Sequence, residues 1–141
     1  MSGQSPEQPW PSRVAPQSTG GWHWDLRSVA DLPRARSELR ARVTGSDAAE
    51  VTEHVVLAFD EMASNALRHG QGTVRACVRE TPGAWLVEVQ DGASGRAPLP
   101  AVGRDPARGG LGLHLIARMA DDHGWWPDGD TKSVWATIPR R

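Results

Sequence analysis

Apolar and polar side chains alternate along several stretches of the chain, and each such stretch predicts a β-strand. The first is WHWDLR, residues 22–27, where we expect the folded part to begin. GTVRACVRE (72–80) and AWLVEVQD (84–91) alternate in the same way, and the TPG between them predicts a hairpin turn. GWWPD (124–128) and SVWATIP (133–139) predict a second hairpin.

Two longer segments repeat their apolar residues at helical spacing. Residues 28–43 predict a first helix whose other face is covered by arginines. Residues 45–70 predict a long second helix. Ser46 or Asp47 can cap its start, and Gly70 is suited to end it in a left-handed conformation.

Two other stretches show no strand or helix period. Residues 1–21 are rich in Pro, Ser, Gln and Gly, and we expect them to form a disordered N-terminal tail. Residues 92–110 form a long connection rich in Gly, Pro, Ala and Arg, which precedes a short third helix predicted over residues 111–122. Connections of this length inside a compact domain are usually functional lids or disordered.

The predicted order is strand, helix, helix, strand, strand, loop, helix, strand, strand. This order predicts an α+β fold, a two-layer α/β sandwich. We expect a mixed, mostly antiparallel sheet with helices covering one face. The 141 residues suggest one domain, which we place at residues 22–141.

Composition argues against several kinds of partner. The formal net charge is −1, so the chain lacks the electrostatic footprint of a protein that binds duplex DNA or an anionic membrane. We therefore expect no direct nucleic-acid binding and no membrane binding. No apolar run approaches the ~20 residues of a membrane span, and no signal peptide is apparent. The single cysteine excludes an intrachain disulfide, and these features favour a soluble cytoplasmic protein.

Glu61 and Asn65 lie four residues apart in the second predicted helix, so their side chains share one face. A carboxylate in such a pair can accept a proton or orient a hydroxyl. The oxygen of the amide is a hard, neutral ligand suited to Mg²⁺. A solvated helix face gives the same pattern, so the pair alone leaves both interpretations open.

Asp91 ends a predicted strand and is followed by Gly92 and Gly95. A buried carboxylate at this position can accept a hydrogen bond from an exocyclic amine, and the glycines allow a flat ring to approach the backbone. An ordinary Asp-Gly turn is the alternative interpretation.

Gly109, Gly110 and Gly112 precede or open the third predicted helix. Backbone N–H groups at a glycine-rich helix start can hold phosphate, and the helix dipole adds attraction. A merely flexible helix start is the alternative. No Lys-Ser or Lys-Thr pair follows these glycines, which excludes a Walker A loop.

Taken in order, these segments resemble the Bergerat-fold ATPase domain shared by gyrase, the heat-shock 90 chaperones, the histidine kinases and MutL. DEMASNALRHG (60–70) resembles its N box, DGASG (91–95) its first glycine box, GGLGLHLI (109–116) its second, and KSVW (132–135) its closing strand. Within this superfamily the chain is most similar to the small anti-sigma-factor serine kinases of bacteria. The resemblance covers residues 22–140.

The resemblance implies a role for each matching residue. Asn65 would hold Mg²⁺, Asp91 would accept a hydrogen bond from the adenine amino group, and Glu61 would be the catalytic general base. The implied ATP contacts are Asn65, Asp91, Gly95, Arg108, Gly109, Gly110, Leu111, Gly112 and Ser133, where the last stands in place of a common Thr. Ala93 departs from the usual glycine and disfavours a positive φ there, so either adenine binding weakens or the turn differs.

The first functional hypothesis is an ATP- and Mg²⁺-dependent protein serine/threonine kinase that acts as an anti-sigma regulatory factor. It would phosphorylate an anti-sigma-factor antagonist of the STAS type and sequester a sigma factor, and the resemblance also implies a homodimer. The alternative is a nucleotide-binding or degenerate interaction module without kinase activity. A histidine kinase domain is less favoured, because the preceding segment is short and polar and offers no dimerisation helix.

Overall fold

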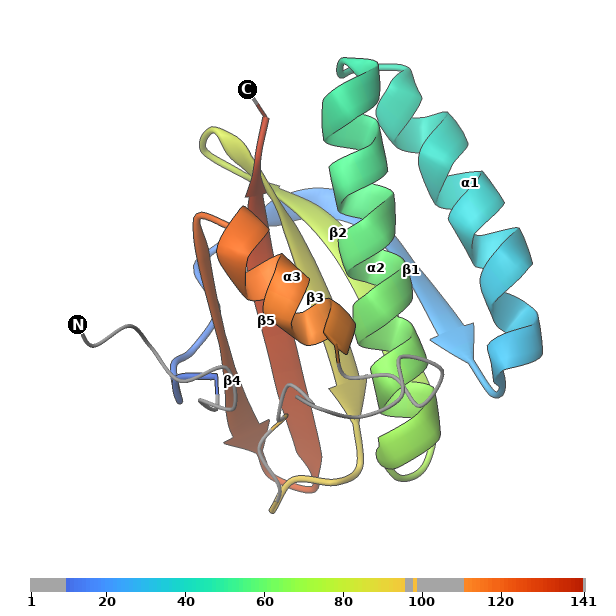
Figure 1. Ribbon diagram of the computed structural model, residues 1–141. Coiled ribbons are helices and arrows are strands. Elements are labelled where there is room, and N and C mark those ends of the chain that lie inside the picture. Colours follow the sequence, from blue (N-terminus) through green and yellow to red (C-terminus); the bar gives the residue numbers. More distant parts are fainter. Residues whose placement is uncertain (1–9, 96–97, 99–110, 141) are drawn as a thin grey trace.

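The computed structural model describes residues 10–95, 98 and 111–140, which form five strands and three α-helices (Figure 1). The elements are β1 Thr19–Leu26, a 3-10 turn Val29–Asp31, α1 Leu32–Thr44, α2 Ala49–His69, β2 Val74–Thr81, β3 Ala84–Asp91, α3 Leu111–Met119, β4 Asp122–Asp128 and β5 Thr131–Pro139. The strands form one sheet in the order β1-β2-β3-β5-β4, and every neighbouring pair is antiparallel.

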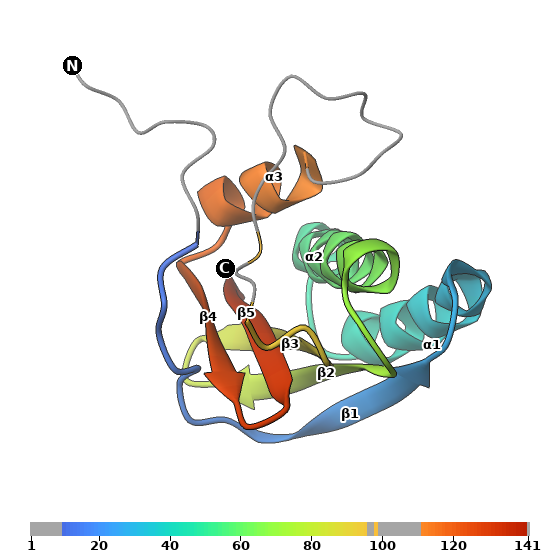
Figure 2. The same ribbon diagram turned by 90° about the horizontal axis from the view of Figure 1, so that it is seen from below.

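The three helices lie on one face of the sheet (Figure 2), so the predicted two-layer α+β sandwich is confirmed. The core lies between the two layers. Leu39 of α1, Phe59 of α2 and Ile116 of α3 are fully buried and belong to one apolar cluster with Val87 and Ala136 of the sheet. Val87 and Ala136 are partners in the register of β3 and β5, so both point to the face that the helices cover.

The first helix begins later than its apolar pattern predicts. Ser28 and Asp31 form a capping box around the short 3-10 turn, in which the Ser28 hydroxyl accepts a hydrogen bond from the Ala30 N–H at 3.2 Å. The α-helical hydrogen bonding starts only at Leu32, and Val29 remains 49% exposed. The side chains of the box accept hydrogen bonds from backbone N–H groups at the start of the 3-10 turn. The chain therefore forms this turn first and becomes α-helical after it.

The expected side-chain cap of α2 is wrong. The N-cap is Ala48, so neither Ser46 nor Asp47 caps the helix. Asp47 instead accepts hydrogen bonds from the indole of Trp85 at 3.0 Å and from the Arg140 guanidinium at 3.0 Å. The Arg140 guanidinium also lies 4.5 Å above the Trp85 ring. This cluster ties the start of α2 to the beginning of β3 and to the C-terminal end of β5.

α2 ends at Gly70 as expected, but the expected reason, a left-handed glycine, is wrong. Gly70 has a φ of −82°, which is not left-handed. A Cβ at Gly70 would lie 2.6 Å from the carbonyl oxygen of Ala66 and 2.6 Å from the carboxyl carbon of Asp91. Glycine is therefore required here because α2 and β3 approach closely.

Within the described residues, no helix has both the length and the apolar character that a membrane crossing needs.

The chain before β1 is not a disordered tail where the structure describes it. Trp10 is only 3% exposed and packs edge-on against the ring of His123 at 4.8 Å. The backbone of Trp125 in β4 donates to Pro11 at 3.0 Å and accepts from Arg13 at 2.9 Å. Residues 10–13 therefore lie along the edge of β4. The expectation of disorder through residue 21 is corrected for residues 10–21, and residues 1–9 lie outside the described residues.

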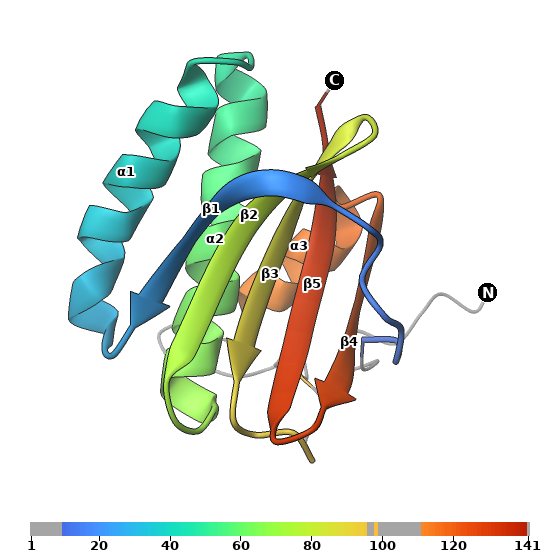
Figure 3. The same cartoon turned by 180° about the vertical axis from the view of Figure 1, so that it is seen from behind.

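From the β4 edge, the chain crosses the face of the sheet that lies opposite the helices and reaches β1 at the other edge (Figure 3). Its carbonyl at Arg13 accepts a hydrogen bond of 2.8 Å from the indole of Trp135, whose ring is buried. β1 begins at Thr19, three residues earlier than predicted, and its register shifts between Thr19 and Trp22. The intervening Gly20 and Gly21 both have positive φ, which other residues adopt only at a cost.

Trp10→Ala should destabilise the protein by about 3 kcal/mol, because it removes a large, buried indole from the core. Val14→Ala is the matched control, since Val14 is 64% exposed, and its effect should stay within ~0.5 kcal/mol. Urea denaturation measures both. Equal stability of the Trp10 variant and the wild type would show that the N-terminal segment is not docked in solution.

Candidate functional site

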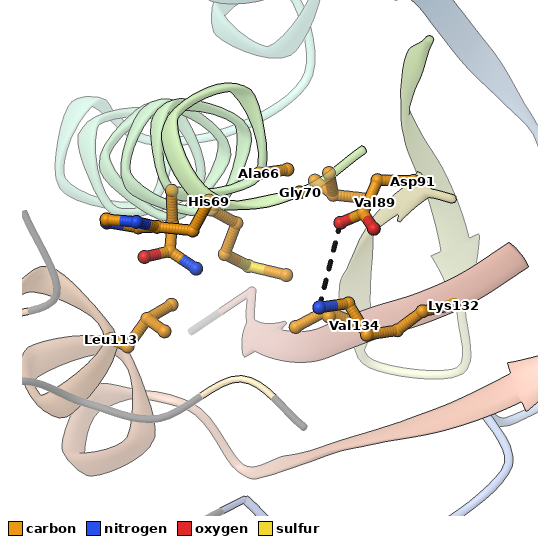
Figure 4. Close-up of a pocket in the computed structure, with 10 residues that line it drawn as sticks. Ala66, His69, Gly70, Val89, Asp91, Leu113, Lys132 and Val134 are labelled. Carbon is orange, nitrogen blue, oxygen red and sulfur yellow. Dashed lines mark ion pairs between the residues drawn. The ribbon is translucent and has the colours of Figure 1, made fainter. Parts of the chain in front are cut away.

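The C-terminal half of α2 lies beside a small polar cavity between the helices and the sheet (Figure 4). Its volume is about 20 Å³, which is room for a single water molecule. The side chains and backbone that line it are Met62, Asn65, Ala66, His69, Gly70, Val89, Asp91, Leu113, Lys132 and Val134. Asn65 and His69 are separated by one helical turn and both border this cavity, whereas Glu61 is not among the residues that line it.

Asp91 is the carboxylate of this cavity. It is the last residue of β3, it is 2% exposed, and it pairs in the sheet register with Lys132 of β5. Its Oδ1 accepts a hydrogen bond of 2.7 Å from the Ala93 N–H. Its Oδ2 lies 3.8 Å from the Lys132 ammonium, the ion pair drawn in Figure 4. The carboxylate is therefore held by one oxygen and faces an ammonium with the other.

The turn after Asp91 accommodates Ala93 without backbone strain. Within residues 10–95, 98 and 111–140, no residue other than glycine has a positive φ. Ala93 is buried, and its N–H holds Asp91. Gly92 approaches Gln71 so closely that a Cβ would lie 2.9 Å from the Gln71 carbonyl oxygen, whereas a Cβ at Gly95 would meet open space. The turn therefore differs from one that needs a positive φ at position 93.

Glu61 and Gly112 are in direct contact. A Cβ at Gly112 would overlap the Glu61 carboxylate in its present position, so any larger residue in the first turn of α3 would require the Glu61 side chain to move. Glu61 is half-buried, and burial is the main cause that raises the pKa of its carboxyl group. The negative charge of Asp60 raises it further and the Arg68 guanidinium opposes the rise. The structure thus brings the predicted general base to the predicted phosphate-binding helix start.

Ser133 is not brought to the cavity. Its hydroxyl donates to the carboxylate of Glu88, and the two residues occupy outward-facing positions of β5 and β3. Successive residues of a strand face opposite sides, so Lys132 and Val134 face the helices in its place. Sequence reasoning missed Lys132. The alternation of β5 contained the signal, because an inward Val134 requires an inward residue two positions earlier.

Several implied nucleotide contacts cannot be placed. Arg108, Gly109 and Gly110 lie outside the described residues. Leu111 is the first residue of α3, and only its backbone position is described. Among the implied contacts of the second glycine box, Gly112 is therefore the residue whose surroundings the structure describes.

The described residues contain no group of three or more His, Cys, Asp or Glu side chains arranged to hold a metal ion. Asn65, which lines the cavity, can offer one amide oxygen, and Glu61 lies one turn away. Mg²⁺ commonly takes only one or two protein ligands and completes its shell with phosphate and water. The residues present thus fit a magnesium ion that arrives with a nucleotide, not one held in a protein cage.

The antiparallel sheet and the helices on one of its faces form an α+β domain with a polar cavity between its two layers. Residues 25–138 match the family model of the histidine kinase-like ATPase domain, which is most of the chain. The chain belongs to this family, and membership implies that it binds ATP. A search of curated proteins found no match.

Gly70→Ala should destabilise the protein by about 2 kcal/mol, because the methyl group would collide with backbone and with Asp91 where neither can move freely. Gly95→Ala is the matched control in the same region. It meets open space and should stay within ~0.5 kcal/mol of the wild type. Urea denaturation decides, and indistinguishable variants would show that α2 and β3 are not in close contact at Gly70.

The raised pKa of Glu61 predicts a pH-dependent stability. The folded state binds a proton at Glu61 more tightly than the unfolded chain does, so this stabilisation is full below the ordinary value of 4.5 and is lost as pH rises through the raised value. The stability of the wild type relative to Glu61→Gln should therefore fall as the pH rises above 4.5 and should level off once the pH passes the raised pKa of the folded state.

Glu53→Gln on the same helix gives a control of opposite sign. A hydrogen bond from Arg40 lowers the pKa of Glu53, so the wild type should gain stability relative to this variant as pH rises. Urea denaturation across the pH range measures both. A Glu61 difference that stays constant with pH would contradict the raised pKa.

Proposed function

We propose that the chain is an ATP-dependent protein serine/threonine kinase that acts as an anti-sigma regulatory factor. One observation carries the proposal. The Glu61 carboxylate lies against Gly112 at the start of α3, one helical turn from Asn65, which lines the cavity that contains Asp91. Asn65 and Asp91 thus line one cavity, and Glu61, which does not line it, lies one helical turn from Asn65, in a family that binds ATP.

Each residue of the proposed site would contact a different part of Mg-ATP. Asp91 Oδ2 would accept a hydrogen bond from the adenine amino group, while the Ala93 N–H keeps the carboxylate oriented. The first turn of α3 at Gly112 would face the phosphates, where free N–H groups and the helix dipole attract negative charge. Asn65 would hold Mg²⁺, which when bound neutralises charge on the phosphates.

Glu61 would act on the hydroxyl of a serine in the protein substrate. The hydroxyl proton passes to the carboxylate, the serine oxygen bonds to the γ-phosphorus, and ADP leaves with the electrons of the broken P–O bond. A raised pKa makes the carboxylate a better proton acceptor, since it lies nearer the operating pH. Most of the acceleration then comes from positioning and charge stabilisation.

The proposed substrate is an anti-sigma-factor antagonist of the STAS type. Phosphorylation of this antagonist would prevent it from occupying the kinase, which would then be free to sequester a sigma factor. We also propose that the chain acts as a homodimer. These partners rest on the resemblance to the bacterial anti-sigma-factor kinases, and the histidine kinase-like ATPase family supports only the shared ATPase domain.

One observation favours a second candidate, an interaction module without kinase activity. The cavity has a volume of about 20 Å³, and the Asp91–Lys132 ion pair lies at its edge. An adenine ring cannot enter unless the surrounding side chains separate. A chain that no longer opens this cavity would keep the fold and use its surface alone.

Calorimetric titration with Mg-ATP separates these candidates at the first step. Magnesium-dependent binding supports the kinase, and absence of binding leaves only the interaction module. The second step is transfer of labelled γ-phosphate to purified STAS-type antagonists. Binding without transfer to any serine or threonine would contradict the kinase proposal.

Glu61→Ala should abolish phosphate transfer and leave the affinity for Mg-ATP nearly unchanged, because Glu61 acts on the protein hydroxyl and not on the base. Asp91→Asn is the complementary variant. It should weaken ATP binding by ~1.5–3 kcal/mol, the range for a lost hydrogen bond to a charged group. Calorimetry and the transfer assay are run on both variants. Loss of both binding and transfer in Glu61→Ala would contradict its role as the base.

A further inference from the structure

Lys132 is an unusual residue for the position that it occupies. It is the only lysine of the chain, and the other residues among its 16 Lys and Arg are all arginines. Its side chain is buried, with 7% of the residue exposed, and it borders the cavity together with Asp91. Burying an ammonium is unfavourable unless it is paired, so its place beside a buried carboxylate is a specific arrangement.

The two charged groups are close but do not form a direct hydrogen bond. Lys132 Nζ and Asp91 Oδ2 are 3.8 Å apart, beyond the usual range for a nitrogen–oxygen hydrogen bond. A third polar group can bridge two such groups at this separation. The Ala93 N–H holds Oδ1, and a Cβ at Gly70 would lie 2.7 Å from Oδ2, so glycine keeps the space beside Oδ2 clear.

The pair places a hydrogen-bond acceptor, Asp91 Oδ2, next to a group that can donate, the Lys132 ammonium. Adenine carries the complementary pattern on one edge, where the amino group donates and the adjacent ring nitrogen N1 accepts. The ion pair is also neutral as a whole, which suits an uncharged ring better than a lone carboxylate beside a polyanionic nucleotide does.

We propose that Lys132 reads the adenine base by donating a hydrogen bond to N1 while Asp91 Oδ2 accepts from the amino group. Lys132 would then be a specificity-determining residue of the nucleotide site. This inference rests on the part of the proposed function that assigns the adenine amino group to Asp91.

A comparison of ATP with 1-deaza-ATP, in which C–H replaces N1, tests this contact directly. The wild type should bind 1-deaza-ATP about tenfold or more weakly than ATP, the effect of a lost hydrogen bond to a charged group. Lys132→Met keeps the length of the side chain without its charge. This variant should bind ATP about tenfold or more weakly and should no longer distinguish the two nucleotides.

Two controls isolate the contact. 7-deaza-ATP changes the other ring of the base and should bind the wild type as ATP does. Arg75→Met removes one positive charge from the opposite face of the sheet, where Arg75 pairs with Asp25, and should leave both affinities unchanged. In addition, ¹³C-labelled lysine gives one side-chain Cε resonance in this chain, which should shift with ATP and much less with 1-deaza-ATP.

The outcomes separate the inference from the function on which it rests. Failure of the wild type to bind ATP would overturn both. Binding of ATP with equal affinity for 1-deaza-ATP would overturn only the contact with Lys132. Tighter ATP binding by Lys132→Met would also overturn it, because the lysine would then compete with the base for Asp91.

Discussion

The contact between Gly70 and Asp91 sets the geometry of the site. The C-terminal end of α2 approaches the last residue of β3 so closely that no side chain fits between them. Because Asn65 and His69 lie on the same helical end, this approach brings their side chains to the carboxylate of β3 and to Lys132 of β5. The residues of the cavity come from segments far apart in the sequence, and the packing of one helix end on one strand end unites them.

The two carboxylates of this region lie in different environments. Asp91 accepts a backbone N–H and faces an ammonium, an arrangement that compensates a buried negative charge. Glu61 is half-buried beside Asp60 and against Gly112, and its desolvation favours the protonated form. Asp91 is thus held by a backbone N–H beside an ammonium, whereas the surroundings of Glu61 raise the pKa of its carboxyl group. In the function proposed above, Asp91 would recognise the base and Glu61 would accept the proton.

The sheet and its layering were predictable from sequence because strands with one buried face carry a period of two. β3 has the predicted bounds, and the turn before it is formed by the predicted residues. The docking of residues 10–13 was not predictable, because it depends on backbone hydrogen bonds of Pro11 and Arg13 to Trp125, more than a hundred residues away, and not on local pattern. The position of Lys132 was predictable in principle. A motif match placed Ser133 at the nucleotide, while the alternation of β5 places Ser133 on the opposite face.

α2 is anchored to β3 at both ends, which restricts where the molecule can move. Asp47, just before the helix, binds the Trp85 indole near the beginning of β3, and Gly70 abuts Asp91 at its end. These two contacts hold α2 against β3, and with it Glu61 and Asn65, at a set distance from the sheet. α3, a helix of nine residues, packs on the core through Leu113 and Ile116, which are both buried. The long helix is therefore joined to the sheet at both of its ends, and the short one packs on the same core through these two side chains.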